Sequence, residues 1–202
     1  MRLRRVGPTG LLIECGGSQQ VEAWRREFWR RRAIGDLIAD DIVPGAETVL
    51  LDGIPPGTAE LVESWPEPDG ASIAEGPLVE IPTAFDGEDL ADVADLWRVP
   101  IAEAIMRLRQ TNFTVAFCGF APGFGYLRGL PDEWSVPRLA APRPRVPAGS
   151  VALAGAYCGI YPTASPGGWR LVGHTALELW DVRRQVPATL SPGTRVKLVP
   201  VS

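Results

Sequence analysis

The first third of the chain alternates between strand-like and helix-like patterns of apolar positions. A short apolar run at residues 10–15 predicts a strand. From Ser18, which is a plausible N-cap, to Ile34, the residues Val21, Trp24 and Phe28 fall on one face of a helix. Arginines occupy the other faces of this segment. The pattern therefore predicts an amphipathic helix.

Three further elements are indicated before residue 86. Residues 49–51 read as a strand, residues 56–65 as a short helix with proline at its start, and residues 78–85 as another strand. The resulting order is strand, helix, strand or hairpin, helix and strand. We expect this order to form a small ferredoxin-like α+β unit.

The second half begins with two helices and continues with short strands. Apolar side chains recur at helical spacing between Leu90 and Trp97, and Pro100 can begin another helix that runs to about residue 109. Six β-branched or aromatic runs then alternate with glycine and proline turns, at residues 113–117, 150–154, 159–161, 169–172, 176–180 and 195–201. So many short strands within roughly ninety residues predict a closed or nearly closed β-barrel.

Prolines and glycines cluster between the two halves. They are Pro66, Pro68, Gly70, Gly76, Pro77 and Pro82. Clusters of this kind are typical of loops and linkers. We therefore expect a ferredoxin-like domain over residues 1–80 and a β-barrel domain, which carries the functional site, over residues 81–202.

Composition excludes several classes of protein. Hydrophobic residues make up 46% of the 202 residues, which is enough for a substantial core. With 24 acidic against 20 basic residues the net charge is −4, which argues against binding nucleic acid by phosphate neutralisation. The apolar stretch after the N-terminal arginines is too short for a signal peptide, and no stretch is long enough for a membrane span. We expect a cytoplasmic protein whose three scattered cysteines are free thiols.

The most unusual stretch combines glycines with aromatic residues directly after a predicted strand. Its candidate binding residues are Gly119, Phe120, Pro122, Gly123, Phe124 and Tyr126. Glycines let backbone N–H groups approach a ligand, and the aromatic side chains can supply an apolar wall with one polar tip. The alternative is a tight corner of the barrel with its aromatic side chains packed inward.

A second candidate is the proline-rich segment at residues 142–150, which carries Arg143 and Arg145. On an extended chain these two side chains point the same way. Paired guanidinium groups bind carboxylates and phosphates bidentately, so the segment is a candidate anion site. A solvated proline-rich loop is the alternative.

The third candidate joins the turn at residues 164–169 to His174, the only histidine of the chain. A neutral imidazole can act as an acid or a base near neutral pH, although a lone histidine is more often structural. The single imidazole excludes a histidine-rich zinc site. The chain also lacks the GxSxG word of a serine hydrolase and a phosphate-binding GxxxxGK[ST] loop. We expect no metal ligands.

Several long words of the sequence, taken in order, resemble the family of the bacterial 5-oxoprolinase B subunit. The family is also described as allophanate hydrolase subunit 1 and as a family of sporulation-kinase inhibitors. The matching words are GFAPGFGYL (119–127), PRPRVPAGS (142–150), GIYPTASPGGW (159–169), GHT (173–175) and LSPGTRVKLVP (190–200). They cover most of the chain after Asp86.

The resemblance implies a fold and a reaction. The implied fold is an N-terminal ferredoxin-like domain followed by a C-terminal cyclophilin-like β-barrel. The implied reaction is the ATP-dependent opening of a cyclic amide, most directly 5-oxoproline with ATP and water to glutamate, ADP and phosphate, or an allophanate hydrolase-like reaction. ATP, with Mg²⁺, is the implied cofactor. The implied partners are a homologous second subunit and, in the 5-oxoprolinase system, a third.

The resemblance also implies roles for residues. Arg143 and Arg145 would neutralise carboxylate or phosphate charge, and His174 would move a proton or donate a hydrogen bond. The glycine-aromatic stretch would cradle the substrate or phosphate. Further residues that we expect at the substrate site are Ser150, Tyr161, Ser165, Gly167 and Gly168.

Two other functions remain open at this point. The family resemblance also allows a regulatory protein that docks on a sensor histidine kinase, which would need an exposed apolar patch. A prolyl isomerase would rest on the implied barrel alone, and a fold does not give a function.

Overall fold

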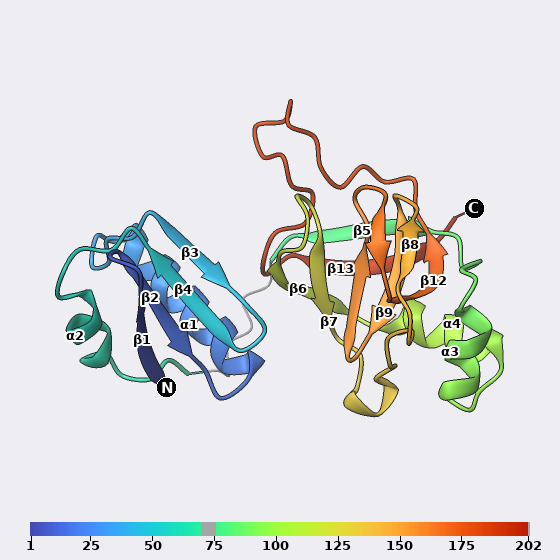
Figure 1. Ribbon diagram of the computed structural model, residues 1–202, viewed down its shortest axis with the longest axis horizontal. Helices are drawn as coiled ribbons and strands as arrows, with labels where there is room; N and C mark the ends of the chain where they lie inside the picture. The colour runs from blue at the N-terminus through green and yellow to red at the C-terminus, as the bar shows by residue number, and fades with distance from the viewer. Residues whose placement is uncertain (70–75, 202) are drawn as a thin grey trace. The chain divides into compact units, whose positions relative to one another are not determined.

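The computed structural model describes residues 1–69 and 76–201. The chain divides into two compact units, Met1–Ala74 and Glu75–Ser202 (Figure 1). Part of the proline- and glycine-rich stretch that we expected at the boundary, including Gly70, lies outside the described residues. No described helix combines the length and the apolar character that crossing a bilayer requires.

Over residues 1–69, the first unit consists of a four-stranded antiparallel sheet with two helices. The sheet order is β1-β2-β4-β3. Its strands are β1 (Arg2–Val6), β2 (Gly10–Glu14), β3 (Asp41–Pro44) and β4 (Thr48–Asp52), and its helices are α1 (Ser18–Ala33) and α2 (Thr58–Glu63). The elements agree with the α+β unit that the sequence predicts, and β1 takes the edge place beside β2.

The edge strand β1 differs from our expectation. We expected the strand at residues 78–85 to complete this unit, but β1 completes it. The arginines of this strand leave it without the apolar run that predicts a strand. Arg2 and Arg4 face solvent, where Arg2 Nη1 lies 3.8 Å from Glu14 Oε2 and Arg4 Nε lies 3.7 Å from Glu14 Oε1 on β2. Charged side chains are common on edge strands because they discourage further strand pairing.

The helix α1 packs its apolar face on this sheet, as its pattern predicts. Val21, Trp24 and Phe28 are buried and share one hydrophobic core with Ile13 and Leu51. The cap of the helix is Gly17 rather than Ser18.

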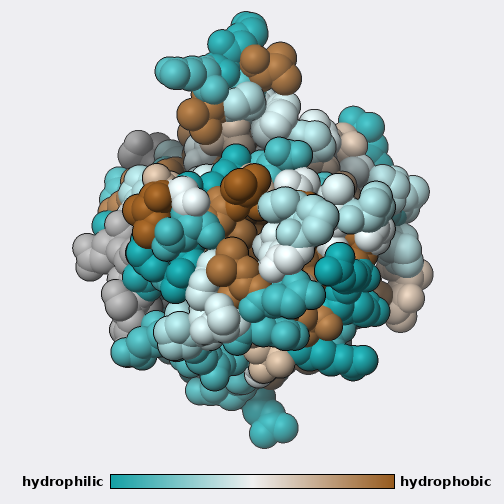
Figure 2. All heavy atoms as spheres, turned by 90° about the vertical axis from the view of Figure 1, so that its left-hand side faces the viewer, coloured by the Kyte–Doolittle hydropathy of each residue, from teal (hydrophilic) through white to brown (hydrophobic). Residues whose placement is uncertain are grey.

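On the surface of the protein, hydrophobic groups lie separated among hydrophilic ones in the view of Figure 2.

The second unit is built on a seven-stranded sheet of order β12-β9-β10-β7-β6-β13-β5. These strands are β5 (Leu78–Thr83), β6 (Phe113–Cys118), β7 (Gly125–Arg128), β9 (Ser150–Ala154), β10 (Tyr157–Ile160), β12 (Arg170–His174) and β13 (Arg195–Pro200). A separate two-stranded sheet joins β8 (Arg143–Val146) to β11 (Ser165–Gly167). The helices are α3 (Leu90–Leu96), α4 (Ile101–Gln110) and the 3₁₀ turn η1 (Asp132–Trp134).

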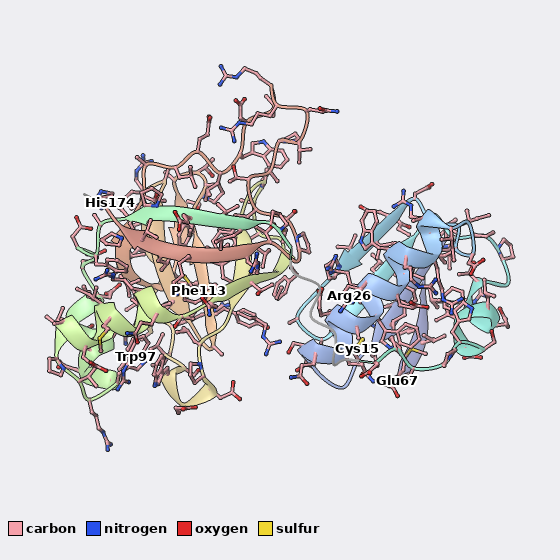
Figure 3. All side chains as sticks on the ribbon, turned by 180° about the vertical axis from the view of Figure 1, so that it is seen from behind. Cys15, Arg26, Glu67, Trp97, Phe113 and His174 are labelled. Carbon is pink, nitrogen blue, oxygen red and sulfur yellow. The ribbon has the colours of Figure 1, made fainter. Side chains whose placement is uncertain are left out.

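The two edges of the seven-stranded sheet meet beyond β5. Ala84 N–H donates to the carbonyl of His174 at 2.9 Å, and His174 N–H donates to the carbonyl of Ala84 at 2.8 Å. This bridge brings the chain after β5 to the end of β12, so the sheet forms a nearly closed barrel. Phe113 is enclosed in its core (Figure 3).

Two expected strands are placed differently by the structure. Residues 78–83 form β5 of the barrel, where they pair in parallel with β13. The boundary that we expected after residue 80 therefore falls within β5. Residues 176–180 form no regular strand, because only Trp180 makes a bridge, to Ala188. They belong to a long loop between β12 and β13 that projects from the barrel (Figure 1).

Candidate functional site

The glycine-aromatic stretch is the turn from β6 to β7. Gly119 N–H donates to the carbonyl of Phe124 at 3.2 Å, and Phe124 N–H donates to the carbonyl of Ala121 at 3.0 Å. Phe120 takes a left-handed φ of 67° and is 61% exposed, near the exposed Pro122. Gly123 has a φ of 84°, and a Cβ there would lie 2.9 Å from the Cβ of a tryptophan on the long loop. The turn thus needs glycine at 123 both for its conformation and for its close approach to that loop.

Aromatic rings from three segments gather around this turn. Phe124 is 2% exposed and contacts the rings of Phe120, Tyr126, Tyr161 and Trp169 edge to face, with centroids 5.0 to 5.6 Å apart. We call the following set the aromatic cluster: Phe117, Phe120, Phe124, Tyr126, Tyr157, Tyr161 and Trp169. Phe124 is therefore packed inward, as the alternative of a tight barrel corner has it, whereas Phe120 is exposed to solvent.

Two glycines let the rings of the aromatic cluster lie directly on the backbone. A Cβ on Gly159 would stand 2.6 Å from Phe124 Cζ and 2.9 Å from Trp169 Cζ3. A Cβ on Gly167 would collide with the Tyr161 hydroxyl. The structure thus brings both glycines, of which the sequence analysis named only Gly167 as a candidate, into contact with the aromatic cluster.

The phenol of Tyr161 lies within the aromatic cluster. Burial raises the pKa of Tyr161, with Tyr126 adding to the shift and Arg138 among the residues that oppose it. The Tyr161 phenol therefore stays protonated at neutral pH.

Arg143 is an internal partner of two carboxylates. Its Nε lies 2.7 Å from Glu88 Oε1, and its Nη2 lies 2.7 Å from Asp89 Oδ1. Nη1 donates to the carbonyl of Trp169 at 3.4 Å, which ties Arg143 to the aromatic cluster. Burial lowers the pKa of this guanidinium, but the hydrogen bonds and charges of Asp89 and Glu88 outweigh it and raise the pKa above its ordinary value. The charge of Arg143 is thus already balanced.

Arg145 differs from Arg143, although both lie on β8. It is exposed and forms no ion pair within the described ranges. Arg138 is also exposed without an ion-pair partner among residues 76–201, and its charge acts on Tyr161. Sequence analysis missed Arg138, because an arginine in a proline-bounded loop carries no distinguishing signal.

His174 ends β12 beside the chain that follows β5 (Figure 3). Its Nδ1 lies 2.8 Å from Asp86 Oδ1, and both side chains are more than half exposed. The described contacts of His174 do not include the aromatic cluster. Asp86 and the pair Glu88 and Asp89 nevertheless belong to one short turn, so His174 and Arg143 both contact that turn. Sequence analysis missed this acidic turn, whose only local signal is the run Asp-Gly-Glu-Asp.

The remaining expected residues surround these groups. Ser150 is buried, pairs with His174 across β9 and β12, and accepts a hydrogen bond from Tyr161 N–H at 3.0 Å through its carbonyl. Ser165 Oγ is buried and has no hydrogen-bond partner in the described part of the chain. The carbonyl of Gly168 accepts from Leu139 N–H at 2.8 Å. Ser150 and Gly168 therefore hold β9 and the loop before β8 in place through their backbones.

The described thiols and carboxylates show no sign of a metal centre. Within residues 1–69 and 76–201, no three His, Cys, Asp or Glu side chains are grouped so that they could hold a metal ion. Burial raises the pKa of Cys158 to about 12, and burial also raises the pKa of Cys118. Both groups remain thiols at neutral pH and are poor nucleophiles there.

Comparison with known proteins shows the family of this chain. A family model described as "Carboxyltransferase domain, subdomain C and D" matches residues 1–190. The chain belongs to this family. The B subunit of 5-oxoprolinase from Escherichia coli O157:H7 is 35% identical over 205 residues, which cover 96% of this chain and 94% of that protein. The resemblance to the family of the 5-oxoprolinase B subunit is therefore confirmed.

Solved structures support the same fold for this family member. The crystal structure of TTHA0988 has a TM-score of 0.76 and 30% sequence identity, and the match covers 100% of this chain. This chain spans only 40% of the TTHA0988 chain. The uncharacterised protein PH0987 from Pyrococcus horikoshii has a TM-score of 0.60 and 29% identity, with 100% of this chain and 98% of that chain covered.

Proposed function

We propose that this protein is a subunit of an ATP-dependent amide hydrolase that opens 5-oxoproline. The observation that carries the proposal is the similarity of nearly the whole chain to the E. coli protein named as the B subunit of 5-oxoprolinase. An allophanate hydrolase-like substrate is the nearest variant, because it too is an amide next to an anionic or polar group.

The groups around the aromatic cluster suit such a substrate. A five-membered lactam has an apolar ring face, and the exposed ring of Phe120 and the half-buried ring of Tyr126 offer surfaces for it. Its carboxylate requires a cation, for which Arg145 is available because it has no ion-pair partner among the described residues. Arg143 would instead position Asp89 and Trp169.

Two exposed arginines also suit the phosphate groups of ATP. Arg138 and Arg145 are exposed, and neither forms an ion pair in the described ranges. ATP supplies the phosphoryl group that turns the poorly electrophilic amide into a reactive one. His174 would accept or donate the proton that the opening of the ring requires. Mg²⁺ would arrive with the nucleotide, because this ion is commonly held by the phosphate groups of its substrate.

The proposed assembly includes at least one further subunit. The name of the E. coli relative denotes one subunit of an enzyme. The TTHA0988 chain also contains additional polypeptide, since this chain spans 40% of it. We infer that a homologous second subunit, and in a 5-oxoprolinase a third, complete the active enzyme.

The test is a reconstitution of the enzyme. The protein is mixed with its partner subunits, ATP and 5-oxoproline, and phosphate and glutamate are measured. We expect Arg145→Ala to raise KM for 5-oxoproline on the order of tenfold through loss of a charge-assisted pair, and His174→Ala to lower kcat on the order of 100-fold. Arg109→Ala, at an exposed arginine of α4, is the matched control. An unchanged KM in Arg145→Ala would remove Arg145 from the substrate site, and an unchanged kcat in His174→Ala would remove His174 from the reaction.

A second function is supported by exposed apolar side chains on the long loop. Val182 and Val186 are 74% and 68% exposed, and the loop projects from the barrel (Figure 1). Such groups suit docking on another protein, including a sensor histidine kinase. Inhibition of kinase autophosphorylation by the wild type, but not by a Val182→Ser and Val186→Ser variant, would favour this function.

A further inference from the structure

The acidic turn between β5 and α3 is fixed on the backbone of β12. It consists of Asp86, Gly87, Glu88 and Asp89. Asp89 N–H donates to the carbonyl of Leu171 at 2.9 Å, and Leu171 N–H donates to Asp89 Oδ2 at 2.6 Å. Asp89 is only 5% exposed, so these bonds are shielded from water. The turn is therefore held in one place relative to β12.

Gly87 shows how closely the acidic turn approaches this strand. A Cβ at Gly87 would collide with the carbonyl of Leu171 and with the backbone nitrogen of Gly173. No other residue fits without moving the turn away from β12. This close approach places Asp86 beside the end of the strand, where His174 lies.

The backbone of His174 is fixed where the barrel closes, between the chain after β5 and β12. Two hydrogen bonds join it to Ala84, which is two residues before Asp86. With both backbones held, the carboxylate of Asp86 meets the imidazole at 2.8 Å. The contact is therefore preorganised by the closure of the barrel.

The carboxylate of Asp86 selects one form of the neutral imidazole. An ionised carboxylate can only accept a hydrogen bond, so Nδ1 must be the protonated nitrogen. The other nitrogen, Nε2, then carries the lone pair, and no hydrogen bond to Nε2 is found among the described residues. An exposed pair of this kind contributes little to stability, so its main effect is on the orientation and tautomer of the ring.

We propose that Asp86 is a positioning residue for His174, which it holds as the Nδ1–H tautomer so that Nε2 is free to accept a proton. The catalytic consequence rests on the proposed function, whereas the tautomer itself does not. Asp86 touches no substrate in this proposal and acts through His174.

The tautomer is measured directly, because His174 is the only histidine. Long-range ¹H–¹⁵N correlation spectra of the full-length ¹⁵N-labelled protein, recorded at a pH where the ring is neutral, report which nitrogen is protonated. We expect the Nδ1–H pattern in the wild type and a shift towards the Nε2–H pattern in Asp86→Ala. Asp86→Asn should restore part of the Nδ1–H pattern, since its amide oxygen still accepts a hydrogen bond.

A matched control is Asp92→Ala, which removes another exposed carboxylate that pairs with β12, through Arg170. It should leave the imidazole signals unchanged. Identical tautomer patterns in the wild type and Asp86→Ala, with both proteins folded by their amide spectra, would overturn the proposal.

Kinetics of the reconstituted enzyme test the consequence separately. We expect Asp86→Ala to lower kcat on the order of tenfold with KM little changed, and to have no further effect in a His174→Ala background. An additive loss in the double variant would show that Asp86 acts independently of His174 and would contradict the proposal. Full activity of His174→Ala would instead contradict the role of His174 in the proposed function and leave the spectroscopic result standing.

Discussion

Gly159 decides how closely two rings of the aromatic cluster approach β10. Phe124 and Trp169 occupy the space where a side chain at this position would stand. The sequence displays a glycine before Ile160, but the rings that require it come from distant segments. The shape of the candidate site is therefore set at single residues by what lies opposite them.

We expect Gly159→Ala to destabilise the barrel unit by about 1–3 kcal/mol, the usual cost of overpacking a core. Gly168→Ala is the control, because a Cβ there would meet Pro142 at an ordinary 3.6 Å. Urea unfolding followed by tryptophan fluorescence measures both. Equal stability of the two variants would mean that the rings can move aside.

The helix α1 combines an apolar face with a row of charge pairs. Glu27 lies 2.8 Å from Arg30 Nη2 and 2.6 Å from Arg31 Nε, and its side chain is 18% exposed. The hydrogen bond from Arg30 is the main cause that lowers the pKa of Glu27 to about 2, with Arg31 contributing and burial opposing. The ionised form of Glu27 is thus part of the folded helix.

This pKa gives the first unit a dependence on acid. Because the folded pKa of Glu27 lies below its ordinary value of 4.5, its contribution is complete above about pH 4.5 and is lost as the pH falls towards 2. We expect Glu27→Gln to be less stable than the wild type at pH 7, with the difference shrinking below about pH 4.5 and vanishing only as the pH falls through 2. Urea unfolding followed by circular dichroism across this range measures the difference. Glu63→Gln, at an exposed residue of α2 without a described ion pair, should show no such trend.

At the scale of the whole molecule, β5 belongs to the barrel rather than to the unit that precedes it. It pairs with β13 from Leu78 to Thr83, and Ile81 is fully buried in the barrel core. The chain after β5 also closes the barrel at His174. Removing β5 would expose an edge of β13 and break the closure of the barrel at His174.

Two fragments test this assignment. A fragment of residues 76–202 retains β5, and we expect it to unfold cooperatively by itself. A fragment of residues 84–202 lacks β5, and we expect it to be unfolded or aggregated because the core loses Ile81 and β13 has an open edge. Circular dichroism and size-exclusion chromatography compare the two. Cooperative folding of the shorter fragment would show that β5 is dispensable.

The sequence by itself determined the elements whose signal is local. The 3.6-residue period of α1 and α3, the proline that begins α4, and the apolar runs of β2, β6 and β9 are contained in each segment. The five matching words likewise indicated the family, and one of them contains three residues of the aromatic cluster, Phe120, Phe124 and Tyr126. Local propensity and side-chain period suffice for these features because the residues that produce them are neighbours in the chain.

Only the tertiary structure decided which partners these elements and residues meet. Asp86 and His174 are 88 positions apart, and Asp89 and Arg143 are 54 apart. β5 pairs with a strand at the far end of the chain, and β1 takes an edge place that its arginines concealed. Contacts of this kind depend on how the sheet closes, and the pattern of residues within one segment does not predict which distant segment it pairs with. The pairing of charges at the site, including that of Arg143 with Glu88 and Asp89, is therefore a property of the closed barrel.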